Sequence, residues 1–259
     1  MQPTISVITV TRNCAATVAD CLASVAAQRG VSCEHIVIDG ASTDATLDIL
    51  GAHREQLSVL VSEPDGGLYH ALNKGIAHAR GDVIGFLHAD DLYADEEVLS
   101  QIAQAFTDPS VCAVYGDLQY VQSADVSRVV RHWKSAPFSA ARLHWGWMPP
   151  HPTLYVRRQC YARLGGFNTR FRIAADYDFM LRLLSQLQSS VGADVMGSAV
   201  YIPRVLVKMR VGGASNRSVR AITRKSVEDY QALRLNGFSV LGAAGALMWK
   251  NLSKLRQFF

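Results

Sequence analysis

The feature that most constrains this chain is the alternation, over its first hundred residues, of short β-branched apolar runs with amphipathic stretches. Four runs predict strands, at 6–11 (SVITVT), 35–39 (HIVID), 58–62 (SVLVS) and 83–88 (VIGFLH). Each is too apolar for a strand with one face in water, which is typical of a parallel sheet covered on both faces. The stretches between them predict helices over 16–28, 43–50, 68–79 and 95–106. Repeated units of this kind predict an α/β fold with a mostly parallel central sheet flanked by helices.

The pattern changes after residue 106. Segments 111–121 and 128–134, with the aromatic and proline-rich stretch 143–158, predict an antiparallel or mixed extension of the sheet. A helix is predicted from Asp176, because apolar side chains follow it at helical spacing. Residues 199–211 predict another extended segment, and two helices close the chain. No internal repeat or low-complexity linker marks a domain boundary.

Charge is distributed unevenly along the chain. Residues 1–202 carry 15 Lys/Arg and 20 Asp/Glu, whereas residues 203–259 carry 11 and 2, a net charge of +9. This basic segment predicts an anionic partner, for which nucleic acid, acidic lipid and a pyrophosphate-bearing substrate are all candidates. A solvated basic helix is the alternative. Nothing earlier in the chain resembles a module that reads nucleic acid, so we expect no nucleic-acid partner.

The first residues lack the features of a secretion signal, and the five cysteines lack paired spacing, so we expect reduced thiols in a cytoplasmic protein. The uncharged run 238–249 is too short to span a bilayer. Continued to residue 259, it predicts a helix lying on an anionic membrane surface at the inner face of the cell membrane. Its apolar face would hold Leu241, Met248, Leu252, Leu255 and Phe259, and its polar face Lys250, Lys254 and Gln257. Packing against the rest of the chain or a second subunit is the alternative, and the oligomeric state stays open.

Carboxylates gather where the predicted strands end. Asp39 follows the second strand, Glu63 and Asp65 follow the third, and Asp90 and Asp91 follow the fourth. The carboxyl ends of parallel strands line one crevice, where ligands bind. Adjacent carboxylates suit Mg²⁺ or Mn²⁺ with open positions for phosphate oxygens. The pattern predicts a metal–diphosphate site, unless the Asp90–Asp91 pair only caps the following helix.

Several segments together resemble the family 2 glycosyltransferases, which have the GT-A fold and use nucleotide-sugar donors. They are SVITVTRN (6–13), HIVIDGASTDAT (35–46), residues 62–91 with their aspartate-rich metal motif, and LGGFNTRFRIAADYDFMLRL (164–183). The resemblance implies a GT-A domain over residues 1–215, with a donor half to about 106 and an acceptor half from 107. A basic helical extension over 216–259 would follow.

The resemblance also implies roles for matching residues on the donor side. Val10, Thr11 and Asp39 would flank the nucleobase, with Asp39 accepting a hydrogen bond from it. Asp65 and Lys74 would border the donor.

Asp90 and Asp91 match the metal motif, and Asp91 is the expected direct ligand of Mg²⁺ or Mn²⁺. Asp176 matches the catalytic base, although it also suits the N-terminus of its helix. The chain departs from the family pattern at Gly40, where many relatives have a second acid, at His88, the first position of the usual Asp-x-Asp, and at Ala175, which replaces a common Glu. His88 weakens the expectation of metal dependence.

On the acceptor side, the resemblance places Trp147 and His151 near the acceptor sugar, in a stretch whose aromatic residues would otherwise fill the core. Arg210 and Arg217 flank a glycine-containing segment, which predicts a loop that closes over the diphosphate.

We therefore expect an inverting transferase that moves one hexosyl or N-acetylhexosaminyl group from a nucleotide-diphosphate sugar to a glycan acceptor. The acceptor would be lipid-linked and belong to polysaccharide biosynthesis. A non-catalytic nucleotide-sugar-binding or scaffold protein is the alternative. A nicotinamide-dependent oxidoreductase is disfavoured, because no G-x-G-x-x-G follows the first strand. A processive synthase would need membrane helices, and the sequence shows none.

Overall fold

The computed structural model describes residues 2–188, 197–212 and 219–255. Within them, one sheet contains nine strands: β1 (Ile5–Thr11), β2 (Cys33–Asp39), β3 (Val59–Ser62), β4 (Val83–Phe86), β5 (Asp91–Tyr93), β6 (Val111–Val121), β7 (Val129–Trp133), β8 (Tyr155–Arg157) and β9 (Ser198–Arg210). The α-helices are α1 (Val18–Ala26), α2 (Thr46–Ala52), α3 (Leu68–His78), α4 (Val98–Ala105), α5 (Ala140–His144), α6 (Arg158–Leu164), α7 (Ala175–Gln188), α8 (Val219–Leu235) and α9 (Val240–Leu255). Two short 3₁₀ turns, η1 (Arg54–Gln56) and η2 (His151–Thr153), complete them.

The strand order is β3-β2-β1-β4-β8-β6-β9-β5, with β7 also paired to β6. The first four strands are parallel, as their sequences predict, and their register places Thr11 beside Asp39 and Asp39 beside Ser62. The carboxyl ends of β1, β2 and β3 therefore lie at one edge. The predicted α/β fold with a flanked central sheet is confirmed.

Successive side chains of a strand point to opposite faces of the sheet. Both faces of β1, β2 and β4 are largely buried, whereas the edge strand β3 is only partly buried. Ile8 belongs to the core that includes α3 and α7, whereas Val7 belongs to the core that includes α1 and α4. Helix α3 lies so close to β1 that a Cβ on Gly75 would come within 2.4 Å of the Ile8 side chain. Glycine at this position lets the C-terminal half of α3 pack closely against the middle of β1.

The second half of the sheet is mixed. Strand β6 runs parallel to β9 and antiparallel to β7 and β8, so the predicted mixed extension is present. The stretch 143–158 is less extended than predicted: only Tyr155–Arg157 forms a strand, and α5 and α6 occupy its flanks. Strand β5 begins at Asp91 and pairs with β9, so Asp90 directly precedes a strand, Asp91 is its first residue, and neither caps a helix.

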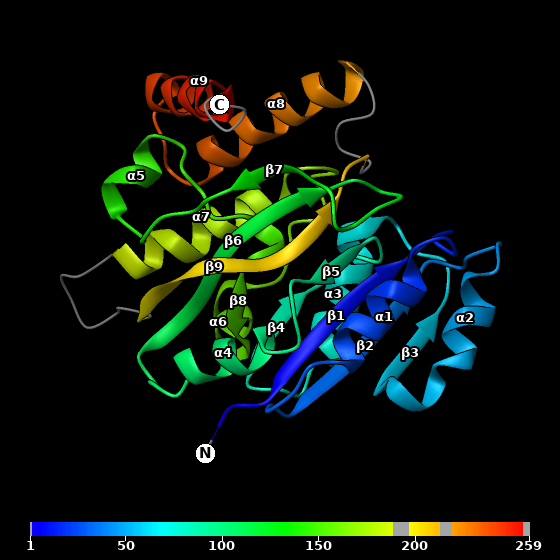
Figure 1. Ribbon diagram of the computed structural model, residues 1–259. Helices are drawn as coiled ribbons and strands as arrows, with labels where there is room; N and C mark the ends of the chain where they lie inside the picture. Colours follow the sequence, from blue (N-terminus) through cyan, green and yellow to red (C-terminus); the bar gives the residue numbers. More distant parts are fainter. Residues whose placement is uncertain (1, 189–196, 213–218, 256–259) are drawn as a thin grey trace.

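Helices α8 and α9 lie together over α7 and α5, at the upper side of Figure 1, while α2 and β3 lie at the opposite end of the molecule. Ala243 and Ala246 of α9 are buried in the main core. Lys250 was expected on a polar outer face, but it points inward and forms a 2.9 Å ion pair with Asp229 of α8. The alternative of packing against the rest of the chain therefore describes this face of α9, while the other apolar face keeps Leu241 and Met248 exposed.

Within the three described ranges, no helix is long and apolar enough to cross a membrane. The side chains of Leu252, Leu255, Lys254, Gln257 and Phe259 lie outside the described part of the chain.

Candidate active site

Asp39, at the end of β2, joins three strand ends through its carboxylate. Its Oδ1 accepts hydrogen bonds from Thr11 Oγ1 at 2.8 Å and Ser42 Oγ at 2.5 Å. Its Oδ2 accepts from the Ser42 backbone N–H at 2.9 Å and from Ser62 Oγ at 2.8 Å. Burial would raise the pKa of Asp39, but these hydrogen bonds outweigh it and lower the pKa below its ordinary value. The group is a buried, fully hydrogen-bonded carboxylate.

This arrangement changes the expected role of Asp39. A carboxylate offers about four acceptor positions, and all four are used within the chain. A nucleobase would have to displace one of these donors to bind Asp39 directly. Thr11 is also buried and commits its hydroxyl to Asp39, whereas Val10 is partly exposed at the same strand end. Position 39 therefore acts first as a brace between strands.

Asp65 lies beside the brace and is partly exposed. Its Oδ1 accepts a hydrogen bond from the Gly67 backbone N–H at 2.7 Å, and Gly67 has a φ of +121°, which favours glycine. A Cβ on Gly40 would lie 2.7 Å from Asp65 Oδ2, so the glycine leaves room for this carboxylate where many family members carry an acid. Asp65 thus stands at the edge where a donor would enter.

Lys74 extends from α3 toward the end of β3. It forms a 2.7 Å ion pair with Glu63, and its side chain is one-third exposed. The structure therefore brings Lys74 to the predicted donor edge, with its charge already shared with a neighbouring carboxylate.

Asp90 and Asp91 lie at the start of β5 with different exposure. Asp90 is partly exposed, whereas Asp91 is fully buried. Asp91 Oδ1 accepts a 3.3 Å hydrogen bond from the Arg210 backbone N–H, and its Oδ2 has no hydrogen-bond partner. Burial, together with the neighbouring charge of Asp90, raises the pKa of Asp91 well above its ordinary value.

These residues fit a divalent cation as partial ligands. An unsatisfied buried carboxylate oxygen costs free energy that a cation would recover. In the described residues, no three His, Cys, Asp or Glu side chains form a complete cluster, so phosphate oxygens and water would supply the other ligands. Asp90 is the more exposed of the two, whereas Asp91 supplies the unsatisfied buried oxygen, so the expectation that Asp91 is the direct ligand stays a prediction.

Arg210 is not the mobile lid residue that its sequence context predicted. It is 5% exposed at the end of β9, and its guanidinium donates to the Asp90 carbonyl at 3.0 Å and to the Ser123 carbonyl at 3.2 Å. A third partner is Asp20 Oδ2, at 2.5 Å. These contacts hold the segment that carries the two aspartates. Arg217 lies outside the described residues.

Asp176, in the first turn of α7, lines a cavity of about 310 Å³. Tyr69 of α3 donates its hydroxyl to Asp176 Oδ1 at 3.1 Å and to the Ile173 carbonyl at 2.6 Å. Lys225 of α8 and Lys250 of α9 line the same cavity. The helix begins one residue earlier, at Ala175, which is fully buried.

Burial would raise the pKa of Asp176, but the charges of His151, Lys225 and Lys250 and the Tyr177 backbone N–H lower it overall. Burial lowers the pKa of His151 itself to about 4, so His151 is neutral at neutral pH. Asp176 is ionised at neutral pH and able to accept a proton.

Two histidines, His88 and His151, lie in the same cavity as Asp176. The rings of His88 and His151 lie 6.2 Å apart, and both line the cavity of Asp176. Burial lowers the pKa of His88 despite the nearby charges of Asp90 and Asp176. His151 therefore shares a cavity with the predicted base, and its predicted place beside the acceptor sugar stays a prediction. His88 lines the same cavity and lies near the charges of both Asp176 and Asp90.

Trp147, expected beside His151, faces a different space. It packs edge-on against Tyr115, with ring centroids 6.0 Å apart, and lines a second cavity next to that of Asp176. The two acceptor-side predictions thus separate into two adjoining cavities.

Glu228 is a residue that sequence reasoning missed. It projects from α8, and its Oε2 accepts hydrogen bonds from the backbone N–H groups of residues 172, 173 and 174, at 3.0, 2.8 and 3.1 Å. It thereby fixes the segment that leads into Asp176. One signal was available, since Glu228 and Asp229 are the only acids in the basic segment 203–259, and both are buried. No feature of the sequence indicated that Tyr69 would donate a hydrogen bond to Asp176.

Comparison with known proteins gives a consistent result. The profile of Glycosyl transferase family 2 matches residues 6–163. An uncharacterized glycosyltransferase of Mycobacterium tuberculosis is 36% identical over 185 residues, which cover 70% of this chain and 68% of that protein. A PGL/p-HBAD biosynthesis glycosyltransferase of Mycobacterium bovis is 33% identical over 189 residues, which cover 71% and 70%.

Two solved structures share the fold. The mannosyltransferase PcManGT from Pyrobaculum calidifontis, in complex with GDP-Man and Mn²⁺, has a TM-score of 0.67 and 22% identity, covering 95% of this chain and 70% of that one. Residues 1–349 of Staphylococcus aureus TarS, in complex with UDP-GlcNAc, have a TM-score of 0.66 and 19% identity, covering 94% and 70%. The chain spans 41% of a longer TarS chain. These likenesses show the GT-A fold.

Proposed function

This chain belongs to glycosyl transferase family 2, and on that premise we propose that it transfers a single hexosyl or N-acetylhexosaminyl group, with inversion, from a nucleotide-diphosphate sugar. The acceptor is a hydroxyl of a lipid-linked glycan in the synthesis of a bacterial surface polysaccharide. The observation that carries the proposal is an ionised Asp176 in a cavity that His88 also lines, where the charges of both Asp90 and Asp176 act on this histidine.

The chain's own residues account for the proton and the leaving group. The acceptor oxygen attacks the anomeric carbon, and its proton passes to an Asp176 carboxylate oxygen. The bond from the anomeric carbon to the diphosphate breaks, and its electron pair leaves with the nucleotide diphosphate. Tyr69 and Glu228 hold Asp176 and its preceding segment in place. Because the attack opposes the leaving group, one displacement inverts the configuration.

The diphosphate would lie near Asp65, Lys74 and the aspartate pair, with Lys225 facing the cavity from α8. Asp90, with Asp91, would hold Mg²⁺ or Mn²⁺, which when bound neutralises charge on the departing diphosphate. The Mn²⁺ in the structure of PcManGT supports this assignment. Because the two structural neighbours carry UDP-GlcNAc and GDP-Man, both nucleotides belong in a first test.

Thermal unfolding of the purified protein tests donor binding. UDP, GDP, dTDP and CMP, and their sugars, are added with Mn²⁺, Mg²⁺ or a chelator. A ligand at one hundred times its dissociation constant adds about 2.7 kcal/mol to the free energy of unfolding, which is a shift of a few degrees for a chain of this size. We expect one nucleotide family to stabilise the protein, and the chelator to remove most of the effect.

The control is Asp90→Asn, in which metal-dependent stabilisation should disappear while the unfolding temperature without ligand stays close to that of the wild type. If no nucleotide or nucleotide sugar stabilises the wild type under any metal condition, the transferase proposal is wrong and a scaffold role replaces it.

A further inference from the structure

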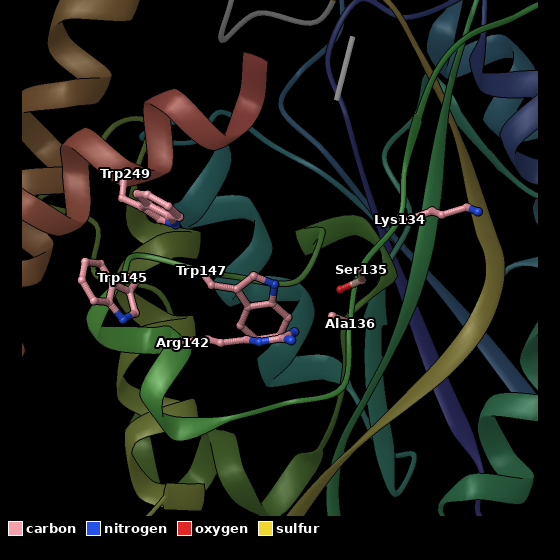
Figure 2. A pocket seen from close by; sticks show the side chains of 7 residues that line it. All are labelled: Lys134, Ser135, Ala136, Arg142, Trp145, Trp147 and Trp249. Atoms are coloured by element: carbon pink, nitrogen blue, oxygen red, sulfur yellow. The ribbon is translucent and has the colours of Figure 1, made fainter. Parts of the chain in front are cut away.

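A second cavity, of about 480 Å³, lies between α5, α9 and the segment that follows β7 (Figure 2). Three of the chain's four tryptophans line it, namely Trp145, Trp147 and Trp249. Figure 2 shows the Arg142 side chain extending beneath Trp147, while Lys134 stands at the edge and points away from the tryptophans. None of these seven lining residues takes part in the proposed chemistry.

This tryptophan cavity adjoins the cavity of Asp176. Three pairs of consecutive residues contribute one member to each cavity: Trp133 and Lys134, Met148 and Trp147, and Lys250 and Trp249. The same backbone segments therefore border both spaces, so the two cavities lie next to each other. A molecule held in one cavity can place an attached group in the other.

The lining selects for an apolar and anionic ligand. The seven lining residues include no Asp, Glu, Asn or Gln, whose side chains commonly accept hydrogen bonds from sugar hydroxyls. The guanidinium of Arg142 suits a phosphate. The Trp145 and Trp249 rings lie 5.7 Å apart and remain 59% and 43% exposed, so they offer apolar surface to a ligand.

Exposed apolar side chains continue from the cavity along α9. Leu241 is 84% exposed and Met248 is 63% exposed on the same helix as Trp249. Exposed apolar side chains beside a cationic group fit a partner with a hydrocarbon part and a negative charge.

We infer that the tryptophan cavity binds the hydrocarbon chain and phosphate of the lipid-linked acceptor, while the acceptor's sugar reaches Asp176 in the adjoining cavity. The inference rests on the proposed function for the position of the sugar. The binding of the lipid itself depends only on the cavity.

Tryptophan fluorescence of the full chain tests this directly. The probes are farnesyl phosphate below its micellar concentration, farnesol, inorganic phosphate and the neutral sugar maltotriose. We expect saturable binding of farnesyl phosphate, weaker binding of farnesol, and none of phosphate or maltotriose. The Trp145→Ala/Trp249→Ala double variant should bind farnesyl phosphate at least tenfold more weakly, and Arg142→Gln severalfold more weakly with farnesol binding unchanged.

Val227→Ala is the matched control, because it removes a half-exposed apolar side chain of α8 that neither lines the cavity nor belongs to the exposed apolar surface of α9. It should stay within twofold of the wild type. An equal loss in Val227→Ala, unchanged binding in both cavity variants, or binding of maltotriose in place of farnesyl phosphate would each overturn the inference. Arg142→Gln keeps the test decisive if the double variant does not fold.

Thermal stabilisation by UDP and GDP is measured on the same samples. Nucleotide binding without binding of farnesyl phosphate rejects the lipid site and leaves the transferase proposal standing. Binding of farnesyl phosphate without any nucleotide binding leaves the lipid site standing and rejects the transferase proposal.

Discussion

The aspartate at a strand end in the first half of the chain and the aspartate at a helix start in the second half differ in how many hydrogen bonds their carboxylates accept. Asp39 has every acceptor position filled by its own chain, so it holds β1, β2 and β3 together. Asp176 receives one hydroxyl and otherwise faces a cavity with two lysines. A carboxylate that is already satisfied contributes to stability, whereas one that is only partly satisfied is available for a substrate. We therefore expect a carboxylate with free hydrogen-bond acceptor positions to be a better candidate for substrate binding or catalysis than one that only matches a sequence motif.

The sharpest test of this contrast is Asp176→Asn. We expect kcat for sugar transfer to fall about 10³-fold, because an amide cannot accept the proton. Stabilisation by the donor nucleotide should stay within twofold of the wild type. Because the pKa of Asp176 is lowered, the wild-type rate should decline only below the ordinary pKa of an aspartate. Full activity in the variant would place the base elsewhere.

Asp39→Asn should act on stability. The amide replaces one acceptor oxygen with an NH₂ group, so that donors such as the Ser42 backbone N–H and the Ser62 hydroxyl would face another donor. We expect a loss of about 3 kcal/mol in the free energy of unfolding, measured with urea. Since the pKa of Asp39 is lowered in the folded state, its contribution is present above the unfolded pKa and is lost as pH falls through the folded pKa. The variant should lack that acid-dependent part.

Asp48→Asn, an exposed change on α2, is the control for Asp39→Asn. If Asp39→Asn keeps wild-type stability but loses nucleotide binding, Asp39 is not mainly a structural residue. The prediction from the sequence that it binds the nucleobase would then hold.

Glu228→Gln should lower kcat about tenfold without changing KM for the donor. Gln retains one acceptor oxygen but loses the charge that holds three backbone N–H groups before Asp176. The measurement is a kcat-against-KM comparison, with exposed Glu55→Gln as the control. An equal rise in KM for the donor would show that Glu228 supports the whole site and not the position of Asp176.

Asp91→Asn should have the smallest effect and the opposite sign. Because burial and Asp90 raise the pKa of Asp91, its ionisation opposes folding, and stability falls as pH rises through the folded pKa. Asn removes that charge, and each pKa unit relieved is worth about 1.4 kcal/mol. Urea unfolding without metal at pH 5 and pH 8 should show a larger gain at pH 8 than at pH 5. A loss at pH 8 would make Asp91 a second structural brace like Asp39.

The sequence predicted most of what depends on local pattern. The four parallel strands, the helices between them and the helix that begins near Asp176 all follow from hydrophobic periodicity. It could not show which carboxylates are satisfied, because the donors to Asp39 come from three segments that only folding brings together. Arg210 was misjudged for the same reason, since its partners lie far away in the chain.

The wall of the Asp176 cavity depends on two helices near the end of the described chain, and this has a consequence for synthesis. Domains begin to fold from their N-terminal parts at about 5–20 residues added per second. The strands that carry Asp39 leave the ribosome more than 200 residues before Lys250, an interval on the order of ten seconds or more. A nascent chain can therefore form the edge where β1, β2 and β3 end before α8 and α9 have been synthesised. The cavity of Asp176 is then still open on the side that these helices line, so we expect no turnover until α9 is in place.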